Sequence, residues 1–241
     1  MAQARAPRQP VRLDSRRSGT TLRLVRSPRL SLMPLRELLA LGVAWVVLGV
    51  SFSTRWMYQL GANLTVFEIF LLTMMIIGTG FLGHELAHKF TAQRYGAWAE
   101  FKLWTIGAVM AIVFSLIPPG TFVFAAPGAV YIASRSSYIG DVMDRKTNGV
   151  ISLMGPLVNI AAAGIFGLAY AALSVLHVGI VIGGFNPLLW AVFINLWLAS
   201  FNMIPFFILD GQKVLTWNRL VWSLITIPLW IGTATMLILL S

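Results

Sequence analysis

The chain has 241 residues, of which 58% are hydrophobic and only 11% are charged, and its formal net charge is +10. Soluble domains carry roughly 25% charged residues, so this composition excludes a soluble globular protein and indicates an integral membrane protein. The chain contains no cysteine, which excludes disulfides and thiolate metal ligands. A transition metal would therefore have to be held by His, Asp or Glu.

Residues 1–35 form a basic tail that we expect to be disordered, because it combines several prolines with little apolar periodicity. Nine of the eighteen basic residues precede the first apolar run, with Asp14 as the only acid among them. By the positive-inside rule, the tail is expected on the cytoplasmic face of a multi-pass cell membrane protein. An organelle membrane is the alternative, and no nucleic-acid partner is expected. The transmembrane domain is expected to cover residues 36–241.

Apolar runs predict several transmembrane helices, because about 20 apolar residues span a bilayer. A charged loop is expected at 135–147, and the sequence Gly183-Gly184-Phe185-Asn186-Pro187 indicates a turn. A short strand is expected at 97–103, where polar and apolar residues alternate. The expected helices, in chain order, are 36–54, 64–95, 148–176, 185–208 and 220–241.

The uncharged stretch 103–134 is interrupted by Pro118-Pro119-Gly120, and each half is short for a membrane crossing. We expect this stretch to enter and leave on the same side, with a shielded β-hairpin at 121–132 around a Pro-Gly turn. The expected fold is an all-α polytopic membrane protein with about five to six transmembrane helices and a re-entrant β-hairpin near the active site.

The sequence His84-Glu85-Leu86-Ala87-His88 is an HExxH pattern. Residues four apart on a helix face the same way, so His84 and His88 can bind one metal ion. Glu85 can take a proton from a water that the metal activates. The pattern therefore predicts a zinc site that still needs one further protein ligand.

Asp210 is the candidate for that ligand. It ends an uncharged run of 63 residues, 147–209, and the expected topology returns it to the same side as the two histidines. A carboxylate at such depth is costly unless it is paired, protonated or bound to a metal.

Three motifs follow one another along the chain: GHELAH at 83–88, GPLVN at 155–159 and an NxxPxxxLDG pattern at 202–211. Together they resemble the site-2 protease family of intramembrane zinc metalloproteases, over about residues 60–215. The resemblance implies one Zn²⁺ per chain, and transmembrane proteins as substrates. It also implies an edge strand that receives the unwound substrate, at 97–103 or 121–132.

The resemblance assigns roles to five residues. It implies that zinc is bound by His84, His88 and Asp210, and that Glu85 acts as general base and acid. Asn159 would hold the scissile carbonyl or its oxyanion.

Two other functions remain open. A catalytically silent relative would bind transmembrane segments without cutting them, but the intact Glu85 argues against it. A cation transporter would use His84, Glu85, His88 and Asp210 as a translocation site, but the uncharged run offers few polar residues to continue such a path.

Overall fold

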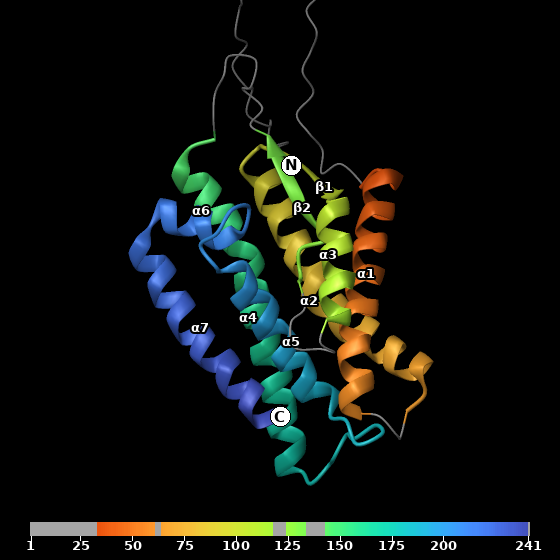
Figure 1. Ribbon diagram of the computed structural model, residues 1–241. Coiled ribbons are helices and arrows are strands. Elements are labelled where there is room, and N and C mark those ends of the chain that lie inside the picture. Colours follow the sequence, from red (N-terminus) through yellow and green to blue (C-terminus); the bar gives the residue numbers. More distant parts are fainter. Residues whose placement is uncertain (1–32, 61–63, 118–123, 134–142, 241) are drawn as a thin grey trace, which may run out of the picture.

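The computed structural model describes residues 33–60, 64–117, 124–133 and 143–240. Nearly all of the tail expected at 1–35 therefore lies outside the described residues, as does most of the charged loop expected at 135–147. Within the described part, the chain forms a bundle of helices with a small two-stranded sheet at one end (Figure 1).

Four of the described helices are long and apolar enough to cross a membrane. They are α1 (Leu35–Leu60), α2 (Val66–Arg94), α4 (Arg145–Val175) and α7 (Arg219–Leu240). Two further apolar helices, α3 (Thr105–Leu116) and α5 (Pro187–Asn202), are shorter. The chain is therefore a mostly helical membrane protein, and the expectation of more than four crossings stays a prediction.

Polar caps set the starts of three helices. Thr65 and Glu68 form a capping box at the start of α2. Asp144 accepts a hydrogen bond from the Thr147 N–H at the start of α4. Asn186 caps α5, whose first residue is Pro187. Just before it, Ile182 and Phe185 exchange backbone hydrogen bonds around Gly183-Gly184, which confirms the turn expected there.

The helix expected at 185–208 is wrong at its end, because α5 stops at Asn202. Pro205 disfavours helical backbone at the residue before it, and Phe207 has a positive φ of 51°. The chain turns here and starts a short helix that was not predicted, α6 (Asp210–Trp217). This turn places Asp210 at the first position of the new helix.

The strand expected at 97–103 is confirmed as β1 (Trp98–Leu103). Residues 121–123 of the hairpin expected at 121–132 lie outside the described residues. In the described part no strand forms in residues 124–127, and β2 (Gly128–Ala133) pairs instead with β1 in antiparallel register. The ladder continues past the strands, with Trp104 N–H donating to Pro127 O at 2.8 Å. Helix α3 lies in the connection between the two paired strands.

Leu103, just before α3, pairs with Gly128 at the start of β2. The chain therefore returns after α3 to the end of the bundle at which α3 begins (Figure 1). The sheet contacts α1 and α2, while α4 contacts α2, α5 and α6. Helix α2 therefore contacts both the sheet and α4. Re-entry of the 103–134 stretch into a membrane stays a prediction.

Candidate metal centre

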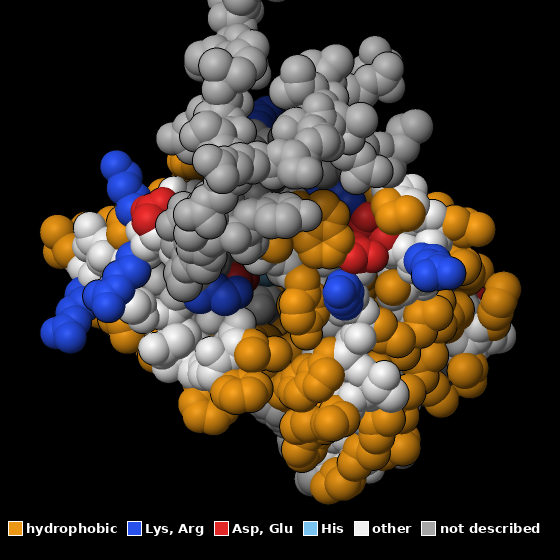
Figure 2. Space-filling view, turned by 90° about the horizontal axis from the view of Figure 1, so that it is seen from above, with side chains coloured by type: hydrophobic (Ala, Val, Ile, Leu, Met, Phe, Trp, Pro, Cys, Tyr) orange, Lys and Arg blue, Asp and Glu red, His pale blue; other side chains and the backbone are white. Residues whose placement is uncertain are grey.

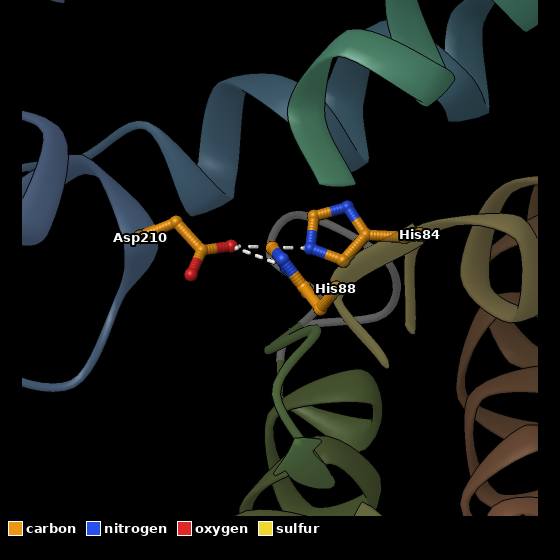
Figure 3. A group of neighbouring side chains, drawn as sticks. All are labelled: His84, His88 and Asp210. Atoms are coloured by element: carbon orange, nitrogen blue, oxygen red, sulfur yellow. Dashed lines mark hydrogen bonds and ion pairs between the residues drawn. The ribbon is translucent and has the colours of Figure 1, made fainter. Parts of the chain in front are cut away.

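His84 and His88 lie one turn apart on α2, and both point at Asp210 of α6 (Figure 3). The His84 Nε2 lies 3.2 Å from Asp210 Oδ2, and the His88 Nε2 lies 2.9 Å from the same oxygen. All three residues are buried, and they form a group that could hold a metal ion. Ligands of a tetrahedral zinc at 2.0–2.2 Å stand about 3.3–3.6 Å apart, so small shifts would accommodate the ion.

Hydrogen bonds fix which ring nitrogens face this centre. His84 Nδ1 donates to Asn159 Oδ1 at 2.6 Å, and His88 Nδ1 donates to the Ile151 carbonyl at 2.8 Å. The Asn159 amide cannot be flipped, because its Nδ2 donates to the Gly80 carbonyl. When the rings are neutral, each Nε2 is then the unprotonated nitrogen, and this tautomer is the one that binds a metal.

The backbone of α4 leaves room beside these nitrogens only because residue 155 is glycine. A Cβ on Gly155 would lie 2.5 Å from His88 Nε2 and 2.6 Å from His84 Nε2. The motif containing this glycine therefore keeps the space at the ligating atoms open. Two imidazoles, one carboxylate and this open space fit a zinc ion.

Asn159 is fully buried, and both ends of its amide are occupied. Besides the bonds to His84 and Gly80, its Nδ2 donates to Asn195 Oδ1 at 3.0 Å. Asn195 in turn donates to the Ala191 carbonyl at 2.8 Å. In this structure Asn159 orients His84, and it does not line the cavity beside the metal group. Its expected contact with a scissile carbonyl stays a prediction and would require one of these bonds to open.

A small cavity of about 40 Å³ lies beside the metal group. This volume is enough for water, which needs about 10–15 Å³. Glu85 lines the cavity and is 8% exposed, and its Oε2 has no hydrogen-bond partner among the described residues. A buried carboxylate oxygen without a partner, next to a metal group and space for water, is placed to accept a proton.

Lys213 lies one turn after Asp210 on α6, with its Nζ 3.3 Å from Asp210 Oδ1. Burial alone would raise the pKa of the Asp210 carboxyl, but the neighbouring His88 and Lys213 hold this pKa well below its usual range. Asp210 is therefore a carboxylate, which is the form a metal requires. Lys213 was missed from the sequence, although its spacing of three residues from Asp210 on a helix predicts such a contact.

The metal group lies toward the end of the bundle that carries the sheet and α6 (Figure 1). Seen from this end, lysine, arginine and acidic side chains gather on the face, and hydrophobic side chains cover the flank (Figure 2). The site is thus close to a charged end of an otherwise apolar molecule.

No family model and no solved structure matches the chain. A protein of Methanocaldococcus jannaschii that bears the name "Putative zinc metalloprotease" is 40% identical to it over 164 residues. The alignment covers 67% of this chain and 78% of that relative. The chain belongs to this zinc metalloprotease family. Membership supports Zn²⁺ as the metal, and the His84, His88 and Asp210 group is where the metalloprotease would hold it.

Proposed function

We propose that the chain is an intramembrane zinc endopeptidase of the site-2 protease type. It would hydrolyse peptide bonds within or near the transmembrane segments of membrane proteins. The observation that carries this proposal is the placement of the metal group between helices that can cross a membrane. Helix α2 supplies two ligands, and α4 supplies Asn159 and Gly155 beside them. The cell membrane, with the N-terminus in the cytoplasm, is the location that the charge distribution favours.

Zinc, when bound, supplies a Lewis acid that activates water and polarises a carbonyl. Glu85 accepts the proton of the attacking water and then donates it to the leaving amine. Asn159 and the Ile151 carbonyl hold the two imidazoles in the metal-binding tautomer. The cavity beside Glu85 has room for the attacking water.

The register of the sheet indicates where a substrate would bind. Phe101 N–H bonds to Glu37 and not to β2, so Phe101 and Val130 form a non-hydrogen-bonded pair. The N–H and C=O of Val130 therefore point away from β1, and those of Gly128 and Ile132 do the same because the pattern alternates. All three residues line the cavity. We propose that an unwound substrate adds to this edge of β2 as a third strand.

The test is cleavage of a model transmembrane substrate by the purified full chain in lipid vesicles. Glu85→Gln keeps the size of the side chain but cannot accept the proton, so it should bind zinc and lose roughly 10²- to 10⁴-fold in cleavage rate. Glu100→Gln is the matched control, because this carboxylate lies on β1 outside the metal group, and it should cleave like the wild type. Cleavage by Glu85→Gln at the wild-type rate would refute the proposal. A wild-type protein that binds the substrate without cutting it would favour the silent relative.

A further inference from the structure

Glu37 and Lys89 form a buried ion pair that the zinc chemistry does not use. Lys89 Nζ lies 2.5 Å from both carboxylate oxygens of Glu37, and the two side chains are 2% and 1% exposed. Removing two charges from water is costly, and well-packed apolar residues in their place are often at least as stable. Stability alone therefore gives no reason for this pair.

The pair connects three elements near the site. Glu37 lies in the first turn of α1, and Lys89 directly follows the metal-binding His88 on α2. Glu37 Oε1 also accepts a hydrogen bond from the backbone N–H of Phe101 in β1, at 3.0 Å. The Phe101 ring packs edge-on against Phe81 of α2, which adds a second contact between β1 and this helix.

These contacts act on the two edges of the sheet in different ways. Glu37 occupies the outward N–H of Phe101 and thus covers the edge of β1 at this position. Val130 lies directly opposite Phe101 in the ladder, and its own outward edge lines the cavity beside Glu85. A shift of Phe101 relative to α2 would therefore carry Val130 with it, because the two strands move as one ladder.

We propose that Glu37 and Lys89 are positioning residues that hold the sheet, and with it the outward edge of β2 beside Glu85, at a fixed distance from the metal centre. The use of that edge by a substrate rests on the proposed function. The positioning of the sheet does not, because it follows from the contacts of Glu37 with Lys89 and Phe101.

Two double variants of similar size separate positioning from packing. Glu37→Gln/Lys89→Gln removes both charges but keeps an acceptor for the Phe101 N–H. Glu37→Met/Lys89→Met keeps the volume and removes the acceptor. Glu37→Asp is a milder third variant, which keeps the charge and draws the carboxylate back from Phe101. The control, Glu100→Gln, removes one charge of a partly exposed ion pair of the same strand and leaves Lys102 against the Tyr131 ring.

Three measurements are made on each full-length variant: zinc per chain, hydrogen exchange of residues 98–103 and 128–133, and KM and kcat for the transmembrane substrate. The methionine variant should keep its zinc. Its strands should exchange on the order of tenfold faster, as expected for the loss of one hydrogen bond, and KM should rise by a similar factor with kcat within about twofold. Glu37→Asp should shift in the same direction, whereas the glutamine variant and the control should match the wild type.

Wild-type exchange and KM in both the methionine variant and Glu37→Asp would overturn the proposal. Equal changes in the methionine and glutamine variants would also overturn it, since packing or charge would then be the cause. Loss of zinc from the methionine variant would show that the pair supports α2 and its histidines, and this would overturn the proposal that it positions the sheet. If the wild type cleaves no substrate, the proposed function fails, and the exchange rates alone still decide whether the pair positions the sheet.

Discussion

Gly155→Ala should weaken zinc binding without unfolding the protein. The new Cβ would lie 2.5 Å from His88 Nε2 and 2.6 Å from His84 Nε2, nearly an ångström inside ordinary van der Waals contact. A zinc site tolerates shifts of only about 0.2 Å in its ligand distances. Both rings would have to turn away, which also strains their hydrogen bonds to Asn159 and to the Ile151 carbonyl. We expect zinc affinity to fall by at least about 10- to 100-fold, as for the loss of a residue that orients a ligand.

The effect on the zinc-free fold should be small. Gly155 lies inside α4, where alanine is favoured over glycine by roughly 0.5–1 kcal/mol, and this gain offsets part of the crowding. Gly164→Ala on the same helix is the control, because a Cβ there meets nothing within 4 Å. Zinc affinity is measured by competition with a chelator, and the free energy of unfolding of the zinc-free protein by circular dichroism. Wild-type zinc affinity in Gly155→Ala would refute the role of the glycine, and unfolding of the variant would refute the claim that the effect is local.

Two further predictions follow from the same contacts and from the proposed topology. Asn195→Leu removes one of the two acceptors of the Asn159 Nδ2 and keeps the other, the Gly80 carbonyl. Zinc affinity in the chelator competition should fall by about 10-fold, because Asn159 orients His84. An unchanged affinity would show that Asn195 serves only in packing. Lys146→Cys and Gly179→Cys place single cysteines in exposed positions near the two ends of α4 in a cysteine-free chain, and a membrane-impermeant reagent should label them from opposite faces of a vesicle. Labelling of both from one face would contradict a crossing by α4.

Much of the fold could be predicted because it depends on local sequence. Apolar runs of sufficient length indicated α1, α2, α4 and α7, since a helix satisfies its own backbone groups wherever it packs. The pairing of His84 and His88 was also predictable, because a spacing of four residues on one helix fixes their common direction. The turn at 183–187 followed from glycine and proline, which restrict the backbone by themselves.

The partners of distant segments depended on tertiary structure. The Pro-Gly sequence at 127–128 predicted a hairpin, but β2 pairs with β1, because strand pairing is decided by competition among distant segments and not by the turn alone. The end of α5 at Asn202 and the start of α6 decide how closely Asp210 approaches the histidines, and seven residues of irregular chain lie between these two helices.

The sequence by itself determined a membrane protein with an HExxH helix and named the residues that form its metal group. Only the tertiary structure showed that Gly155 keeps the ligating nitrogens clear, and that Glu37 meets both Lys89 and Phe101. The spacing of residues within one helix is fixed by its geometry. Glu37 and Lys89 lie 52 residues apart in the sequence. Their contact depends on how the faces of α1 and α2 pack, which no local sequence pattern encodes.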